Sequence, residues 1–196
     1  MTIVHRRLPF LALVTLLALA VAPAWHPAMA PAGDASGETG RAERLDRLHV
    51  ALLGAPDAFV AAEIADEIWT IWFTAPDSEA QVMLDAARQS LRYGDYERSV
   101  TILDTVVERW PDYAEGWNQR ATVRFLQERY EASLADVDRV LALEPRHFGA
   151  LAGRALIYFR QERRDAANRA ILAALRVHPW LAERGLLDPA YEEAPL

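Results

Sequence analysis

The sequence contains few of the side chains that carry out catalysis or bind metal ions. It has no cysteine and no lysine in 196 residues, so all 21 basic residues are arginine. Thiol nucleophiles, disulfides, Cys-ligated zinc and lysine-tethered cofactors such as pyridoxal phosphate are therefore excluded. Histidine and the acidic residues remain as candidates for acid–base or metal chemistry.

Three histidines lie beyond the N-terminal segment 1–32, at His49, His147 and His178. None belongs to a His-x-x-x-His or His-Glu-x-x-His motif, the spacing that places two metal ligands on one face of a helix. We interpret His147 as a residue that begins a helix, and His178 as a last-turn residue whose positive charge the helix dipole favours. The histidines therefore predict neither a metal site nor a cofactor.

The acidic pairs do not predict a catalytic dyad either. Asp136 and Asp138, like Glu192 and Glu193, are too close in sequence to share one face of a helix, and we interpret them as solvated surface charges. Glycine-rich phosphate loops and a Gly-x-Ser-x-Gly motif are also absent from the sequence. We therefore expect that the protein is not an enzyme.

The charge balance argues against a nucleic-acid partner. There are 28 acidic residues against 21 basic ones, and the net charge is −7, whereas a phosphate backbone selects a basic surface. The arginines alternate with Asp and Glu along the chain, a pattern typical of a salt-bridged, solvated helix face. These features leave a helical module that binds other proteins as the expected class.

The segment 1–32 has the features of a signal peptide. Two arginines precede an uncharged apolar run over 8–22, which is long for a core helix and short for a membrane-spanning one. Small residues suit cleavage after Ala30 or Ala32, and we favour Ala32 because Pro31 would follow the bond cut after Ala30. We expect a periplasmic or secreted protein without a lipobox. The alternative is an uncleaved signal that anchors the domain in the inner membrane.

Residues 33–42 are mostly small and polar, and we expect a flexible linker there. Helical periodicity then predicts an N-terminal helical hairpin over 43–75. Gly54 and Pro56 interrupt the periodicity, and Asp57 is placed to cap the second helix. We expect this hairpin to cap one end of the stack of helix pairs that follows.

The strongest signal in the sequence is a regular repeat. Pro111, Pro145 and Pro179 lie 34 residues apart, and each follows a helix-like segment. A period of about 34 residues is typical of helix–turn–helix repeats. The prolines place three helix–turn–helix units over 80–113, 114–147 and 148–179. Small residues recur where the two helices of each unit should approach most closely, namely Ala87, Ala121, Ala155, Ser99, Ser133 and Ala167. One unit cannot bury its apolar face alone, so the units must stack.

Local signals support the same unit boundaries. A turn is predicted at one offset in all three units, over 94–96, 128–130 and 162–164. A capping box is predicted over 112–115 for the second unit, and Ser78 with Gln81 offers a similar pair for the first. The tail over 180–196 is expected to form a C-terminal capping helix.

On these residues, the segment 78–179 resembles the tetratricopeptide repeat (TPR) family. The stretches 111–121 and 143–151 are similar to small exported TPR proteins of alphaproteobacteria. The resemblance implies an all-α fold, an α-α superhelix with three regular repeats, the N-terminal hairpin and the C-terminal capping helix. It also implies that the first helix of each unit lines a concave groove for a partner's peptide or helix. Arg120 and Arg154 depart from this family, which has an apolar residue at their position.

The groove positions of the family, transferred to this sequence, give the candidate partner-binding residues. They are Gln81, Leu84, Arg88, Leu91, Asn118, Thr122, Phe125, Leu156 and Phe159. An apolar strip for peptide side chains is expected from four of them, Leu91, Phe125, Leu156 and Phe159. Asn118 and Gln81 are expected to hydrogen-bond the peptide backbone. The alternative is that Phe125 and Phe159 pack within the protein itself.

Two functions are consistent with these features. The first is a periplasmic adaptor that binds a client peptide or protein in its concave groove. The alternative is a structural accessory subunit of an envelope complex, held by its convex face and its termini. Self-association through an unpaired end of the stack is a further contact that such repeats allow.

Overall fold

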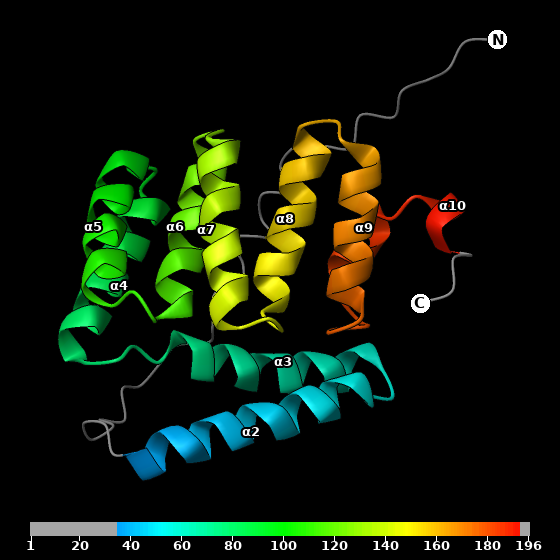
Figure 1. The fold of residues 1–196 in the computed structure, drawn as a ribbon, viewed down its shortest axis with the longest axis horizontal. Helices are drawn as coiled ribbons and strands as arrows, with labels where there is room; N and C mark the ends of the chain where they lie inside the picture. The colour runs from blue at the N-terminus through cyan, green and yellow to red at the C-terminus, as the bar shows by residue number, and fades with distance from the viewer. Residues whose placement is uncertain (1–34, 193–196) are drawn as a thin grey trace. The chain divides into compact units, whose positions relative to one another are not determined.

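The structure, a computed structural model, describes residues 35–192, and the predicted signal peptide over 1–32 lies outside them. All regular secondary structure in the described part of the chain is helical (Figure 1). The predicted fold class, an all-α protein with an α-α superhelix of helix pairs, is confirmed. Between residues 35 and 192, no helix is both long enough and apolar enough to cross a membrane.

The N-terminal hairpin consists of α2 (Ala35–Leu53) and α3 (Ala58–Phe73). Residues 35–42 are therefore helical, where the sequence predicted a flexible linker. The cause is a long-range contact, because the guanidinium of Arg41 donates to the carbonyl oxygens of Ile71 at 2.7 Å and of Thr74 at 3.4 Å. These two bonds attach the first half of α2 to the end of α3.

The turn between α2 and α3 is as the sequence predicted. The carboxylate of Asp57 accepts hydrogen bonds from the backbone N–H groups of Phe59 and Val60, both at 2.9 Å. These N–H groups have no partner inside the helix, so the carboxylate fixes where α3 begins. The predicted cap at Asp57 is confirmed.

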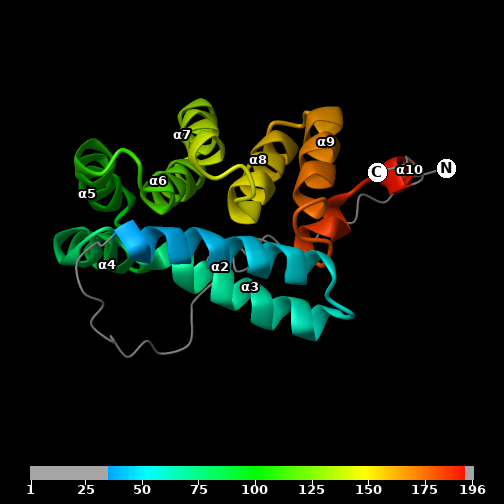
Figure 2. The same ribbon diagram turned by 60° about the horizontal axis from the view of Figure 1, so that its bottom comes forward.

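Three helix pairs follow the hairpin. Their bounds are α4 (Ser78–Arg92) and α5 (Tyr96–Arg109), α6 (Ala114–Leu126) and α7 (Tyr130–Leu143), and α8 (Phe148–Arg160) and α9 (Arg164–Leu175). Each helix packs against the next one along the chain. In Figure 2, α4, α6 and α8 lie in one row and α5, α7 and α9 in another. We call these the first-helix row and the second-helix row.

The turn inside each pair repeats with the predicted period. Gly94, Glu128 and Glu162 have φ angles of 76°, 61° and 59°, so all three residues adopt the left-handed conformation that ends a helix. Glycine adopts this conformation at no steric cost, whereas Glu does so only at a small one. The predicted turns at these offsets are confirmed.

The small residues of the repeat lie where the two helices of a pair touch. Ala87, Ala121 and Ala155 are buried. The hydroxyl of Ser99 donates to the carbonyl oxygen of Ala87 at 2.9 Å, and that of Ser133 donates to Ala121 at 2.7 Å. Serine is therefore tolerated in this apolar contact because its hydroxyl has a backbone acceptor one helix away.

Two predicted capping boxes are wrong. At the start of α4 it is Asp77, with an extended backbone, that accepts a first-turn N–H at 2.8 Å, so Ser78 is already helical. The side chain of Gln81 points to the next turn of its own helix. The box over 112–115 does not form either, because the carboxylate of Glu115 turns into the core instead of capping α6.

The hairpin lies along the turns between the pairs rather than over the end of the stack. The Tyr113 hydroxyl, before α6, donates to the carbonyl oxygen of Trp72 at 3.1 Å, and the Trp180 indole donates to that of Ala55 at 3.2 Å. Phe148, the first residue of α8, is buried among the hydrophobic residues of α2 and α3. Figure 1 shows the two helices running across the lower ends of the pairs. The expectation that the hairpin covers one end of the stack is therefore wrong.

No single capping helix forms after α9. Beyond Pro179 the chain makes a short 3-10 helix, η1 (Ala182–Leu186), and one further turn, α10 (Pro189–Glu192). Leu187 is buried against α9, and the partly buried Leu186 packs against the same cluster. This segment therefore covers only part of the surface that a full helix would cover.

Candidate functional site

The residues predicted to bind a partner all lie on the first-helix row, but they differ in exposure. Leu84, Asn118 and Leu156 are buried within the protein. The other six are half-buried, namely Gln81, Arg88, Leu91, Thr122, Phe125 and Phe159. The predicted apolar strip therefore loses Leu156 as a contact surface.

Three apolar side chains remain at one position of the repeat. Leu91, Phe125 and Phe159 are separated by the repeat period, and each lies at the C-terminal end of its helix. Their backbone carbonyls accept the N–H groups of the left-handed residues that end the helices, at 3.0, 2.9 and 3.1 Å. This shared hydrogen bond gives the three side chains equivalent backbone positions. We call Leu91, Phe125 and Phe159 the apolar row.

Each side chain of the apolar row packs on one side against its own pair. Leu91 joins the hydrophobic cluster of α4 and α5, and the Phe125 ring lies 5.9 Å from that of Tyr130. Phe159 lines a pocket beside α9. Because all three also keep part of their surface in solvent, the row combines internal packing with an accessible face.

Asn118 was expected to hydrogen-bond a peptide backbone, but it is not available for that contact. Its side-chain amide donates to the carboxylate of Glu115 at 3.0 Å, and the Gln119 amide donates to the same carboxylate. Glu115 is only 1% exposed. A buried carboxylate must be hydrogen-bonded to be tolerated, so these amides stabilise the core.

The third partner of Glu115 is His147, and together they form an acid–histidine pair that the sequence analysis missed. The ring nitrogen Nδ1 of His147 accepts the N–H of Ala150 at 3.2 Å, which assigns the proton to Nε2. Nε2 then donates to Glu115 at 3.1 Å. The predicted helix-start role of His147 is confirmed.

This pair is enclosed rather than catalytic. His147 is completely buried, and its ring stacks on the Trp72 indole with centroids 4.0 Å apart and an interplanar angle of 9°. A substrate has no access to a side chain in this position. Glu115 and His147 are 32 residues apart, which is close to the repeat period. This spacing is the signal in the sequence that could have indicated their contact.

The hairpin contacts the first-helix row at α8 and at α4. A Cβ atom at Gly149 would lie 2.5 Å from Cη2 of Trp69, so glycine is needed for the indole to approach α8. The guanidinium of Arg88 lies 4.1 Å from the centroid of the Phe73 ring. Residues of α3 therefore contact the first turn of α8 and, through Arg88, the C-terminal half of α4, one turn before Leu91 of the apolar row.

The arginines that depart from the family pattern belong to ion-pair networks. Arg120 makes two hydrogen bonds to Asp136, at 3.0 and 2.7 Å, and a third to Asp104 at 2.7 Å. Arg124 also donates to Asp136, at 2.8 Å. Burial opposes the charge of Arg120, but these bonds outweigh it and hold its pKa above the usual value. Asp136 is 2% exposed, so its interpretation as a solvated charge was wrong, whereas that of the exposed Asp138 is confirmed.

His178 has a different role from the one expected. It lies beyond the end of α9, is buried, and contacts the ring of Phe148 edge to face with centroids 5.0 Å apart. Its Nδ1 has no hydrogen-bond partner in the described structure. Burial lowers the pKa of His178 to about 4, so the predicted favourable contact of a cation with the helix dipole is wrong.

No group of three His, Asp or Glu side chains within the described residues is arranged to hold a metal ion. The candidate sites that remain lie on the surface. These are the apolar row and the half-open pocket beside α9.

Comparison with known proteins finds a TPR repeat-containing relative. The chain is 36% identical over 95 residues to a protein of Rhizobium etli described as a TPR repeat-containing protein, a match that covers 48% of this chain and 47% of that one. The chain thus spans about half the length of this relative. No family model matches the chain. A solved structure titled "MamA RS-1 ArsTM double mutant" is 19% identical, covers 71% of this chain and 76% of its own, and superposes with a TM-score of 0.48.

The predicted resemblance to TPR proteins is confirmed by the curated relative and by the repeated helix pairs. TPR proteins are generally scaffolds without catalytic activity, which use stacked helices to present a surface to other proteins. The fold and the relative thus support a protein–protein interaction module in general terms.

Proposed function

We propose that this TPR-type protein binds a peptide segment of a client protein through the apolar row. The observation that carries the proposal is the periodic spacing of Leu91, Phe125 and Phe159, which repeats one half-buried apolar side chain on three successive first helices. A regular series of apolar contacts suits a chain that runs across the helices and places side chains at intervals. At α8, Trp69 of the hairpin occupies the first turn, so the contact lies towards the C-terminal end of that helix.

The surroundings of Leu91 and Phe125 in the apolar row favour an uncharged part of the peptide. Thr122 lies one helical turn before Phe125 and already donates its hydroxyl to the carbonyl of Asn118 at 3.0 Å. The Arg88 cation is held over the Phe73 ring and lies 3.9 Å from Asp85. Because neither group offers an unopposed charge, apolar burial is the main source of affinity.

The site of action that we propose is the periplasm. The supporting features are the basic residues and the apolar run that begin the sequence, followed by small residues at the proposed cleavage positions. The mass of the protein purified from the cell envelope tests this. A chain beginning at Gly33 supports cleavage after Ala32, and an intact N-terminus would support an inner-membrane anchor instead.

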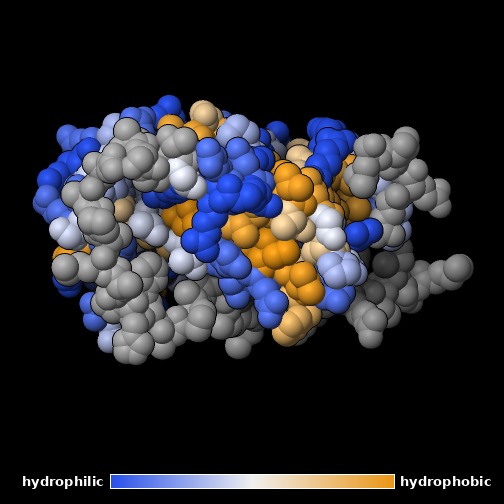
Figure 3. Space-filling model, turned by 90° about the horizontal axis from the view of Figure 1, so that it is seen from below, coloured by the Kyte–Doolittle hydropathy of each residue, from blue (hydrophilic) through white to orange (hydrophobic). Residues whose placement is uncertain are grey.

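A second candidate function is a structural accessory subunit held by surfaces other than the apolar row. Large apolar side chains are exposed on the hairpin, with Val50 71%, Leu53 53% and Phe59 73% exposed. Figure 3 shows hydrophobic residues gathered beside a band of hydrophilic ones on the face seen from the side of the hairpin. Exposed apolar patches of this kind often mark contacts between proteins.

Peptide selection separates the two functions. A random peptide library displayed on phage is selected against the purified protein, and the affinities of the enriched peptides are measured by fluorescence anisotropy. Phe125→Asp is expected to weaken binding at least about tenfold, because it removes an apolar anchor. The control Ala135→Asp changes an exposed residue of α7 and should leave the affinity unchanged.

The melting temperature of Phe125→Asp completes this test. An accessible Phe125 predicts a small change in melting temperature, whereas a fully packed one predicts severe destabilisation. Peptides that bind the Phe125→Asp and wild-type proteins equally well would exclude the apolar row. If the selected peptides instead lose binding to the Phe59→Asp protein, the hairpin surface is the binding site, and the structural role replaces the proposed one.

A further inference from the structure

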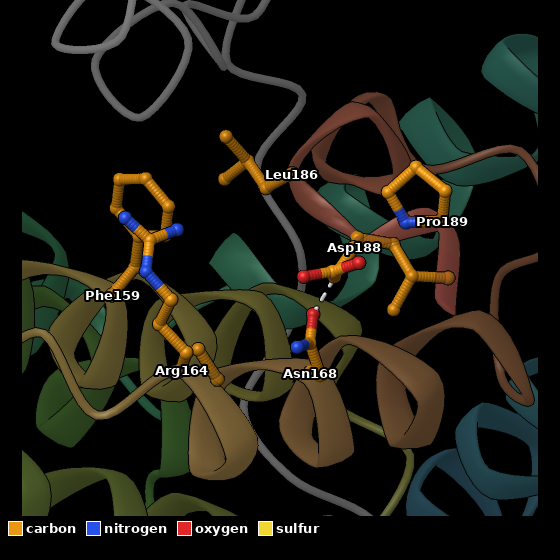
Figure 4. Close-up of a pocket in the computed structure, with 8 residues that line it drawn as sticks. Phe159, Arg164, Asn168, Leu186, Asp188 and Pro189 are labelled. Carbon is orange, nitrogen blue, oxygen red and sulfur yellow. Dashed lines mark hydrogen bonds between the residues drawn. The ribbon is translucent and has the colours of Figure 1, made fainter. Parts of the chain in front are cut away.

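A half-open pocket of about 250 Å³ lies between the end of α8, the start of α9 and the segment that follows η1 (Figure 4). Phe159 and Leu186 form its apolar walls, and Arg164, Asn168 and Asp188 supply its polar groups. Phe159 is also the last member of the apolar row. The pocket is therefore a continuation of the proposed binding surface towards the C-terminal end of the stack.

The pocket results from the way the repeat ends. At the two earlier junctions, a full first helix of the next pair packs against the preceding second helix. After α9 the chain forms only η1 and α10, fixed by the Tyr191 hydroxyl, which donates to Asp165 at 2.6 Å. Space that a fourth first helix would fill is therefore left open beside α9.

The polar side chain at the base of the pocket has a free donor. Asn168 is 4% exposed, and its Oδ1 accepts the backbone N–H of Asp188 at 3.0 Å. No hydrogen bond from its Nδ2 to a described residue is formed, and this nitrogen is not among the enclosed polar atoms without a partner, so it is open to solvent at the pocket (Figure 4). Because its hydrogen-bonding capacity is not used within the protein, this nitrogen can donate to a carbonyl oxygen of a bound partner.

Charges of opposite sign face each other across Asn168. The guanidinium of Arg164 lies 5.7 Å from the centroid of the Phe159 ring and forms no ion pair within the described residues. On the other side lies the carboxylate of Asp188, one oxygen of which accepts the N–H of Ala190 at 3.0 Å. A simple anion such as phosphate would be repelled by Asp188, whereas a peptide group presents both an acceptor and a donor.

We propose that this pocket binds one apolar residue of a partner peptide that is followed by an acidic residue. The apolar side chain packs between Phe159 and Leu186. The backbone carbonyl of that residue accepts from Asn168, and its N–H donates to Asp188. The following carboxylate pairs with Arg164. This inference rests on the proposed function, since it assigns a sequence preference to the end of the same binding surface.

A titration followed by NMR tests the pocket with a defined probe. The 15N-labelled protein is titrated with N-acetyl-Leu-Glu-N-methylamide, and N-acetyl-Ala-Gln-N-methylamide serves as the control probe. We expect saturable shifts of the Asn168 side-chain amide with the first probe and much weaker binding of the second. Equal binding of both probes, or no shift at Asn168 at the highest soluble concentration, would overturn the proposal.

Variants assign the binding to the named groups. Arg164→Gln should weaken the Leu-Glu probe about fivefold, the effect of one lost charge-assisted hydrogen bond. Arg169→Gln, on the same helix but outside the pocket, is the matched control. Asn168→Asp keeps the acceptor for the Asp188 N–H and removes the donor, so it should abolish the shifts. If Asn168→Asp does not fold, an unchanged affinity in Arg164→Gln alone contradicts the proposal.

The same experiment distinguishes failure of the pocket from failure of the proposed function. Shifts around Phe125 without shifts at Asn168 would refute the pocket and leave the apolar row as the binding surface. Shifts at Asn168 that survive Phe125→Asp, together with selected peptides that also ignore Phe125→Asp, would support the pocket and refute the apolar row.

Discussion

The contact between Trp69 and Gly149 makes a direct prediction about what holds the hairpin on the helix pairs. The substitution Gly149→Ala adds one methyl group to the first turn of α8. Its carbon would lie 2.5 Å from Cη2 and 2.9 Å from Cζ2 of the Trp69 indole. Contacts this short require the indole, the helix or both to move.

The indole has little room to move. Its ring centroid lies 5.3 Å from Phe73 in a stacked arrangement, and 5.2 Å from Trp72 and 5.3 Å from Phe148 in edge-to-face arrangements. Inserting a methyl group into such packing costs about 1–3 kcal/mol. The change from glycine to alanine returns at most about 1 kcal/mol of helix propensity, and less in a first turn. We therefore expect a net loss of about 1–2 kcal/mol in the free energy of unfolding.

Urea unfolding followed by tryptophan fluorescence measures this loss, and α8 itself contains the matched control. A Cβ at Gly153 would have no neighbour within 4 Å, so Gly153→Ala should be neutral or stabilise the protein by up to about 1 kcal/mol. Combining Gly149→Ala with Trp69→Leu should be less destabilising than the sum of the two single changes, because the smaller side chain makes room. If Gly149→Ala is as stable as Gly153→Ala, the close approach of the hairpin to α8 is wrong.

Three further predictions concern buried polar groups. The folded-state pKa of His178, about 4, lies below its unfolded value of 6.5, so its contribution to stability is present above pH 6.5 and is lost on acidification towards pH 4. His178→Leu should remove this loss, on the order of 2 kcal/mol, from unfolding free energies measured between pH 7 and 4. Asp136→Ala leaves two arginines without their shared partner and should cost about 3 kcal/mol in urea unfolding, whereas the exposed Asp138→Ala should cost less than about 1 kcal/mol; equal costs would contradict the burial of the first. Glu115→Ala removes the acceptor of three side-chain donors, His147 among them, and should lower the melting temperature by an amount that corresponds to about 3 kcal/mol; an unchanged melting temperature would show that the carboxylate is not part of the core.

Features set by neighbouring residues in the chain could be predicted from the sequence. The repeat period predicted the helix pairs, and the left-handed turn residues lie at its offsets because a helix must end within a few residues of its last carbonyls. Asp57 was recognised as a cap since its partners are two and three residues away. By contrast, Asp77 was missed because Ser78, next to it, carries an equally good capping group.

Features that depend on long-range packing could not be predicted. The position of the hairpin depends on contacts such as Trp180 to Ala55, which are 125 residues apart in the chain. Asp136 and Asp138 look alike in the sequence, and only the neighbouring α6 decides which of them is buried. The repeat period alone gave no sign that α3 would cover the start of α8.

The candidate site was predicted in part for the same reasons. The position of the apolar row follows from the period, and its three members are half-buried on equivalent turns. Asn118 was placed on the correct helix, but its amide is used by Glu115, a partner that the consensus positions do not include. The pocket beside α9 could not be expected, because it exists only where the repeat fails to continue.

Photo-crosslinking in living cells tests the apolar row most directly. A benzoylphenylalanine replaces Phe125 in one strain and the exposed Ala135 of α7 in another, and the adducts are identified by mass spectrometry. The account predicts one dominant partner captured from position 125 and absent from position 135, and loss of this adduct when Phe159→Asp is added. Adducts of equal yield from both positions, or a partner captured from position 135 alone, would contradict it.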